Sequence, residues 1–131
     1  MKEPLTPAEW IVMRALWEKS PMTLSETIAQ IGDGPDWSYK TFSAYMAILE
    51  KKGFIGADKR GRDKFYYPLV SHAECVERES KSVLEKIKAG SVGLMVTSMV
   101  RAGNLDATER RALLSELEKM LEQEAQDESG R

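Results

Sequence analysis

The most regular hydrophobic pattern in the chain lies between residues 38 and 53, where apolar side chains recur every three or four positions. These residues are Phe42, Tyr45, Met46 and Leu49. This spacing predicts a helix that buries one face. Ser38 carries a side chain suited to an N-cap, and Gly53 tolerates the left-handed conformation that follows many helix ends. The predicted helix therefore has defined ends as well as a defined buried face.

Two other helical patterns precede this one. Residues 6–9, Thr-Pro-Ala-Glu, form a capping box with proline at the first helical position, and residues 23–26, Thr-Leu-Ser-Glu, form a second capping box. The apolar stripe of the first helix consists of Trp10, Met13, Leu16 and Trp17. This helix is expected to end at Ser20-Pro21. The second helix is expected to point Ile28 and Ile31 inward before the glycine- and proline-rich break at residues 32–35.

A β-hairpin is predicted directly after Gly53. Residues 54–58 and 64–69 contain aromatic and β-branched side chains, and residues 59–63 between them include Gly61 as a turn residue. Pro68 suits a strand end because it cannot donate a hydrogen bond to a neighbouring strand. Three helices followed by a hairpin within about 70 residues predict a winged helix-turn-helix domain. The fold class is therefore mostly α with a small β-hairpin.

The C-terminal half is predicted to be a helical dimerisation region over residues 71–125, after a DNA-binding domain over residues 1–70. Helical patterns run from His72 to about Arg101, with a break at residues 89–93, and a third capping box, residues 106–109, opens the last helix. We expect the dimer interface to contain Leu94, Val96, Met99, Val100, Leu113, Leu114, Leu117, Met120 and Leu121. The alternative is packing of these helices onto the first helix. Residues 126–131 are expected to be a frayed tail.

Charge is unevenly distributed along the chain. The whole chain has a formal net charge of −2, whereas residues 40–64 hold seven basic and three acidic side chains, a net charge of +4. The face of the third helix opposite its apolar stripe carries lysines at both ends and small side chains between them. Such a face can approach the major groove of DNA, with basic residues against the phosphates. Taken alone, the basic hairpin loop is better explained as a solvated charged turn, but its position directly after this helix favours contact with phosphates.

These patterns lead to a set of candidate DNA-binding residues. The base-reading face is predicted to contain Lys40, Thr41, Ser43, Ala44 and Ala47, with Ser38 and Tyr39 near the phosphates at the start of the helix. The expected phosphate contacts are Lys51, Arg60, Arg62 and Lys64. The predicted partners are double-stranded operator DNA and a second copy of the chain.

Other classes of function find little support in the sequence. It contains no glycine-rich phosphate loop, nucleophile motif or acid–base constellation, so an enzyme is not expected. A single cysteine, Cys75, and a single histidine, His72, are too few for a metal site within one chain, and no cofactor is expected. No apolar run is long enough to span a bilayer and no signal-peptide core is present, so we expect a cytoplasmic protein.

Several segments together resemble the penicillinase-repressor family of winged-helix regulators (the BlaI/MecI/CopY type). The resemblance is carried by residues 5–10, Leu-Thr-Pro-Ala-Glu-Trp, by Asp36-Trp37-Ser38 with Lys40-Thr41, and by residues 51–55, Lys-Lys-Gly-Phe-Ile. Residues 65–67, Phe-Tyr-Tyr, resemble the family's wing strand. The resemblance covers residues 5–70 and continues loosely to about residue 122. It implies a homodimeric transcriptional repressor that binds a pseudo-palindromic operator.

The chain also departs from better-known members of that family. Those members usually have an arginine and a threonine where this chain has Ser43 and Ala44, so a bidentate contact from that arginine to guanine is absent and a different operator is expected. The asparagine–phenylalanine bond that is cleaved in some relatives aligns roughly with Ser98-Met99, and the Cys-x-Cys motifs of copper-responsive relatives are missing. We therefore assign neither release by proteolytic cleavage nor release by copper to this chain.

Two alternatives to a repressor stay open at this stage. One is a winged helix that binds an acidic protein partner, and the other is a DNA binder that is indifferent to sequence. The sequence does not identify the operator, the regulated genes, the inducer, an upstream sensor or protease, the release mechanism, or any redox role of Cys75.

Overall fold

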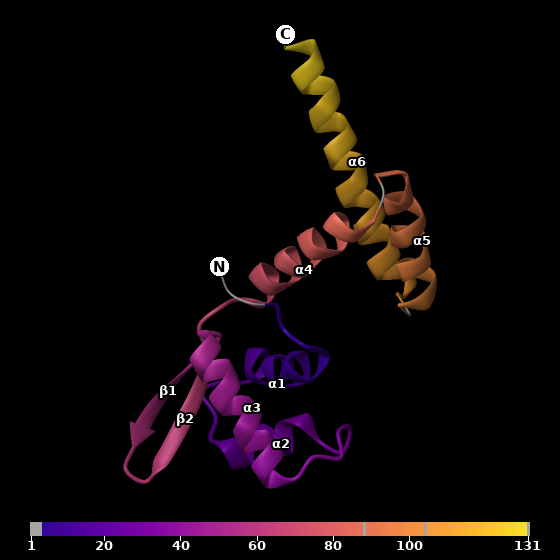
Figure 1. Ribbon diagram of the computed structural model, residues 1–131. Helices are drawn as coiled ribbons and strands as arrows, with labels where there is room; N and C mark the ends of the chain where they lie inside the picture. Colours follow the sequence, from indigo (N-terminus) through magenta and orange to yellow (C-terminus); the bar gives the residue numbers. More distant parts are fainter. Residues whose placement is uncertain (1–3, 88, 104, 131) are drawn as a thin grey trace. The chain divides into compact units, whose positions relative to one another are not determined.

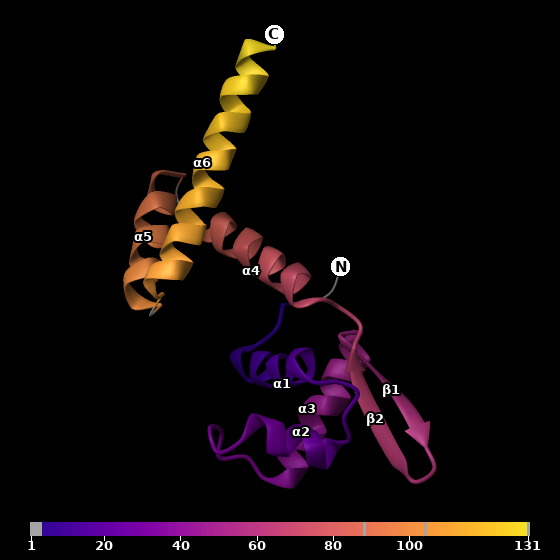
Figure 2. The ribbon, with the colours of Figure 1, turned by 180° about the vertical axis from the view of Figure 1, so that it is seen from behind.

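The computed structural model describes residues 4–87, 89–103 and 105–130, and the chain divides into two units, residues 1–83 and 84–131. The first unit contains α1 (Pro7–Glu18), α2 (Leu24–Ile31), α3 (Tyr39–Lys52) and a hairpin of β1 (Ile55–Arg60) and β2 (Asp63–Pro68). The helix α4 (His72–Lys86) follows the hairpin. This order confirms the predicted winged helix-turn-helix arrangement, in which the hairpin projects from the three helices (Figures 1 and 2).

Local capping chemistry sets the helix boundaries of the first unit. Thr6 and Thr23 each accept a hydrogen bond from the backbone of the glutamate three residues later, and each glutamate accepts one from the threonine backbone. Both predicted capping boxes are therefore formed, which satisfies backbone N–H groups that the helices leave without partners. At the C-terminal end of α3, Gly53 adopts the left-handed conformation with a φ of 84°.

The hairpin is longer and its turn is tighter than the sequence pattern predicts. Lys59 and Arg60 belong to β1, and the turn between Arg60 and Asp63 consists of Gly61 and Arg62. The difference arises because Gly61 adopts a φ of 65°, which allows a two-residue connection. Pro68 ends β2, as predicted.

A single β-bridge adds to the two-stranded sheet. Met22, between α1 and α2, exchanges two backbone hydrogen bonds with Tyr66 of β2, at 3.0 and 2.7 Å. Met22 is buried, so this bridge also places an apolar side chain in the core. The bridge therefore joins the hairpin to the connection between α1 and α2. Met22 precedes α3 in the chain and Tyr66 follows it, so the bridge links the segments on either side of α3.

The buried core of the first unit is formed by residues of α1, α3, β1 and α4 and of the segments that precede or connect the elements, while α2 and β2 contribute partly buried side chains. Its buried members are Leu5, Val12, Met13, Leu16, Met22, Met46, Leu49, Phe54, Ile55, Val70 and Cys75. Trp10 and Trp17, predicted to be buried, are only partly buried and pack against this core. Trp17 donates its indole N–H to the carbonyl of Val70 at 2.9 Å. Its polar edge is therefore satisfied while its rings cover the core.

The first turns of α4 belong to the core of the first unit, although the sequence predicts a domain boundary after residue 70. Cys75 is buried in this core, and the ring of His72 lies 4.9 Å from that of Trp17 between centroids. Ser71 and Glu74 exchange the two hydrogen bonds of a capping box. Because Cys75 of α4 packs in the core, apolar contact continues past the hairpin. The first unit therefore extends to residue 83.

The second unit contains a short 3-10 helix, η1 (Ala89–Ser91), followed by α5 (Val92–Ala102) and α6 (Ala107–Ser129). The break predicted at residues 89–93 is present as η1. Asp106 caps α6 by accepting from the backbone N–H of Glu109 at 2.8 Å. The helix includes residues 126–129 of the segment that was expected to be a frayed tail; residue 131 lies outside the described residues. Residues 107–129 contain no glycine or proline that would end the helix earlier.

No helix in the described part of the chain is both long enough and apolar enough to cross a membrane.

Candidate nucleic-acid interface

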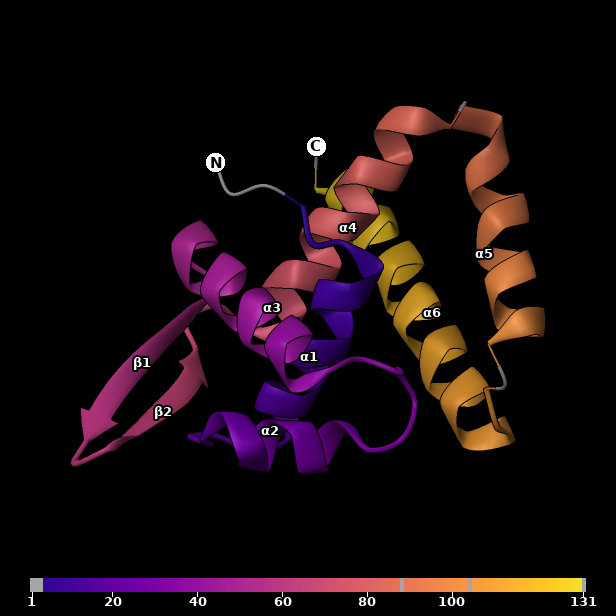
Figure 3. The ribbon, with the colours of Figure 1, turned by 60° about the horizontal axis from the view of Figure 1, so that its bottom comes forward.

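The helix α3 lies beside α1 (Figure 3), and it has one buried face and one exposed face. Phe42, Met46 and Leu49 are buried, as the apolar stripe predicts. The exposed positions are Tyr39, Lys40, Ser43, Ala44, Ala47, Ile48 and Lys51. Six of these seven were predicted from the sequence, and Ile48 was missed. All seven side chains are open to solvent on one helix, which is the arrangement that a helix needs to enter a groove.

The start of α3 is fixed by its cap and by an aromatic cluster. Ser38 accepts a hydrogen bond from the backbone N–H of Thr41 at 3.2 Å, and the two hydroxyl oxygens are 3.0 Å apart. The Trp37 ring packs at 5.0 Å from Phe42 and 4.8 Å from Tyr45 between centroids. Ser38 and Thr41, both predicted to face DNA, therefore also position the first turn of the helix.

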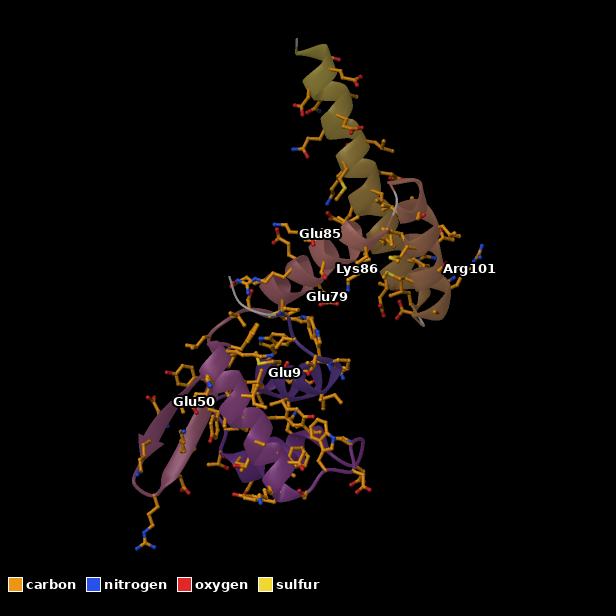
Figure 4. All side chains as sticks on the ribbon, viewed as in Figure 1. Glu9, Glu50, Glu79, Glu85, Lys86 and Arg101 are labelled. Atoms are coloured by element: carbon orange, nitrogen blue, oxygen red, sulfur yellow. The ribbon has the colours of Figure 1, made fainter. Side chains whose placement is uncertain are left out.

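The end of α3 is fixed by an ion pair that the sequence analysis did not identify. The Lys52 ammonium lies 2.9 Å from Glu9 Oε1, and the Glu9 side chain is buried, at 2% exposed (Figure 4). Burial raises the pKa of the Glu9 carboxyl, but hydrogen bonds from Thr6 and from Lys52 outweigh it, so the pKa lies below its ordinary value. The carboxylate stays charged and joins the first turn of α1 to the last turn of α3.

A second ion pair joins α3 to the hairpin. The Lys64 ammonium lies 3.0 Å from Oε1 of Glu50 and 5.4 Å from the centre of the Tyr66 ring; Glu50 is labelled in Figure 4. The hydrogen bond to Glu50 raises the pKa of Lys64 above its ordinary value. Lys64, predicted to contact phosphate, is therefore paired with a carboxylate on α3. Because Lys64 lies opposite Lys59, close to the turn, this ion pair holds the outer part of the hairpin beside that helix.

The tip of the hairpin carries the remaining predicted phosphate contacts. Arg60 and Arg62 are exposed on either side of Gly61, and the Arg60 guanidinium carbon lies 5.0 Å from the centre of the Phe65 ring. Stacking on an aromatic ring restricts the Arg60 side chain without using its N–H donors. These donors stay available for a phosphate.

The charge of this surface is concentrated in a few side chains. Of the basic residues between positions 40 and 64, Lys52 and Lys64 form ion pairs in the described structure, and those for which it records none are Lys40, Lys51, Lys59, Arg60 and Arg62. These five lie at the ends of the exposed α3 face and along the outer part of the hairpin. Within the described ranges, no group of His, Cys, Asp and Glu side chains could hold a metal ion.

The predicted dimer residues lie on exposed surfaces of the second unit. On α6, Leu113 is half-buried, and the other four side chains are exposed: Leu114, Leu117, Met120 and Leu121. Their spacing of three and four residues makes one stripe along the helix. On α5, Val96 and Val100 share a face, but Leu94 lies about 160° around the helix from Val96. The α6 stripe is therefore the more continuous of the two surfaces.

Comparison with known protein families gives a match over most of the chain. The family described as penicillinase repressor matches residues 5–123. The chain belongs to this family. The family resemblance noted in the sequence is thus confirmed, and a family of repressors agrees with the expectation that the chain is not an enzyme.

Individual relatives support this membership. The chain is 31% identical over 115 residues to the methicillin resistance regulatory protein MecI of Staphylococcus aureus (strain N315), covering 88% of this chain and 94% of the relative. It is 29% identical over 114 residues to the penicillinase repressor of Bacillus licheniformis, covering 87% and 89% of the two chains. Both alignments extend well beyond the winged-helix unit into the second unit.

A solved structure extends the comparison to the fold. The solution structure of the DNA binding domain of the repressor BlaI matches 56% of this chain and 93% of its own, with 30% identity and a TM-score of 0.50. This similarity confirms the winged-helix fold predicted from the order of helices and strands.

Proposed function

We propose that the chain is a transcriptional repressor that binds a pseudo-palindromic DNA operator as a homodimer. Membership of the penicillinase repressor family and similarity to the DNA binding domain of BlaI support this proposal. The observation that carries it is the exposed face of α3, which has lysines at both ends and only small or aliphatic side chains at its centre. In this proposal α3 enters the major groove and Ser43, Ala44 and Ala47 approach the base edges.

The hairpin supplies contacts that do not depend on sequence. Arg60 and Arg62 reach the phosphates beside the groove, while Lys40 and Lys51 contact the backbone at the two ends of α3. The ion pairs Glu9–Lys52 and Glu50–Lys64 set the direction of α3 and its angle to the hairpin. Lys64 contributes a weaker phosphate contact, because its ammonium group is paired with Glu50.

The second unit joins two copies of the chain. Its helices expose apolar side chains that the described residues of the unit do not cover, with Leu121 at 66% and Met120 at 58% exposed. A two-fold axis pairs the same stripe from two chains, and it gives the two α3 helices the symmetry of a palindromic site. A protein with this task acts in the cytoplasm, where the chromosome is accessible to it. Any upstream sensor or protease would act on this assembly.

The test is a titration of the full chain against the DNA upstream of its own gene, with a shuffled duplex as control, at two salt concentrations. The proposal predicts tight binding to the native duplex that weakens as salt rises, because bound phosphates release counterions. Equal binding to both duplexes would establish the sequence-indifferent alternative. No salt-dependent binding to any fragment in a genome-wide selection would favour an acidic protein partner instead.

A further inference from the structure

Ile48 is an exposed apolar side chain within the face of α3 that carries the proposed reading residues. Its side chain is 42% exposed. Ile48 lies four residues after Ala44 and three before Lys51, and these spacings place side chains next to one another on a helix surface. On a helical wheel, the seven exposed positions of α3 span about 180°, with Ala47 near the middle and Ile48 at one edge, next to Ala44. Ala44, Ala47 and Ile48 therefore form a continuous aliphatic part of this face.

Local structure gives no reason for an isoleucine at this position. A β-branched residue has a lower helix propensity than alanine or lysine, so Ile48 does not help α3 to form. Because Ile48 is 42% exposed, the core of the first unit gains only part of what a fully buried isoleucine would contribute. A single exposed apolar residue is common on proteins, but this one lies between two lysines on the helix that the proposed function inserts into DNA.

The chemistry of the major groove restricts what such a face can recognise. Alanine and isoleucine side chains have no hydrogen-bond donor or acceptor, so they cannot bond to the polar edges of the bases. The apolar group that base pairs display in the major groove is the C5 methyl of thymine. Contact between Ile48 and this methyl would remove both from water. The flanking Lys40 and Lys51 match the phosphates on either side, which favours DNA over an apolar protein surface as the occupant of this face.

We propose that Ile48, supported by Ala44 and Ala47, reads thymine methyl groups, so that each operator half-site has thymine in the base pairs that face this aliphatic part of α3. This inference rests on the proposed function and specifies its substrate. Recognition is then largely by apolar contact, and Ser43 on the same face adds a hydrogen bond.

The test replaces thymine by uracil, which removes the methyl and leaves the hydrogen-bonding pattern unchanged. An operator is first selected from a random duplex pool with the full chain. Each thymine of one half-site is then changed to uracil, and the affinity of the wild type is measured on every duplex. We expect about fourfold weaker binding for each methyl that Ile48 contacts.

The same duplexes are measured with Ile48→Ala and with Leu69→Ala. Leu69 is also an exposed aliphatic residue of the first unit, but it follows β2 and does not lie on α3. With Ile48→Ala the ratio of thymine to uracil affinity should fall to about one at the position that Ile48 contacts, and with Leu69→Ala it should stay as in the wild type. Thermal unfolding of each variant verifies that the fold is intact.

The outcomes separate this inference from the proposed function. A selected operator that binds equally well with uracil at every position would overturn the inference and leave the repressor proposal standing. A methyl effect that persists in Ile48→Ala would overturn the assignment to Ile48. A selection that enriches no sequence would overturn both.

Discussion

The two units of this chain differ in how far their apolar side chains are buried. In the first unit, apolar residues from α1, α3, the hairpin and the start of α4 share one buried core. In the second unit, α5 and α6 contain no buried residue, and most of their large apolar side chains are exposed. A unit with its own core is stable by itself, whereas helices without one gain stability from another surface. The difference suggests a division of work in which one unit binds DNA and the other pairs the chains.

The largest expected effect comes from placing a charge in the stripe of the second unit. Leu117→Asp should abolish the dimer at micromolar concentration, because a carboxylate would be buried in an apolar interface. Operator affinity should fall roughly a thousandfold, since the second half-site contact is then no longer intramolecular. Sedimentation and operator titration measure the two effects.

Ser115→Asp is the matched control for this variant. Ser115 is exposed on the opposite side of α6, about 160° from Leu117, and its substitution should leave the dimer intact. A Leu117→Asp variant that sediments as a dimer would show that the α6 stripe is not the interface.

A change at Lys52 tests what holds the first unit together. Lys52→Met leaves the buried Glu9 carboxylate without its ammonium partner, and the free energy of unfolding should fall by about 2–3 kcal/mol. Chemical denaturation measures this value. Lys51→Met, one residue earlier and exposed, should change stability by less than about 0.5 kcal/mol. Equal effects of the two variants would mean that the ion pair does not stabilise the native state.

Acid should weaken the ion pair between Glu9 and Lys52. The pKa of Glu9 is lowered in the folded chain, so the unfolded chain binds the proton more readily. The stabilisation is fully present above the ordinary glutamate value of 4.5 and is lost as the pH falls from there through the lowered native pKa. Glu9→Gln should therefore flatten the dependence of unfolding free energy on pH in this range. An unchanged slope would assign the acid sensitivity to other carboxyls.

Substitution of a hairpin arginine should weaken binding to every DNA sequence to the same extent. Arg60→Ala should weaken binding about fivefold per chain and lower the salt slope by about one unit per chain, because one phosphate contact is lost. Lys64→Ala should have a smaller effect, since Lys64 is paired with Glu50. Titrations at several salt concentrations give both slopes. A larger change for Lys64 than for Arg60 would contradict this ranking.

The effect confined to the fewest base pairs is expected at Ser43. Ser43→Ala removes a hydroxyl from the exposed α3 face, and it should change the preference at one base pair about threefold to tenfold without a general loss of affinity. Binding to a panel of single-base operator variants measures the preference. Equal losses on all sequences would remove Ser43 from the reading residues.

The features that the sequence predicted correctly depend on neighbouring residues. The caps at Thr6, Thr23 and Ser38 and the left-handed Gly53 follow from interactions within four residues, and the buried stripe of α3 follows from helical period. The missed features depend on contacts between distant residues. Glu9 meets Lys52 from 43 positions away, and Thr27, fully buried on α2, has no apolar signature.

The candidate site shows the same division. The exposed face of α3 could be predicted from its period, including its lysines and small side chains. Ile48 was missed because an isoleucine suggests burial, and its exposure is decided by where Phe42, Met46 and Leu49 meet the core. That Lys64 is partly neutralised depends on the hairpin folding back beside Glu50, which no local pattern encodes.

The division of work between the two units can be measured most directly by hydrogen exchange of the full chain, at two protein concentrations and with and without operator DNA. The account predicts that operator DNA protects α3 and the hairpin at either concentration, and that raising the concentration without DNA protects α5 and α6 alone. Protection of α5 and α6 that is independent of concentration, together with no protection of α3 by DNA, would contradict it.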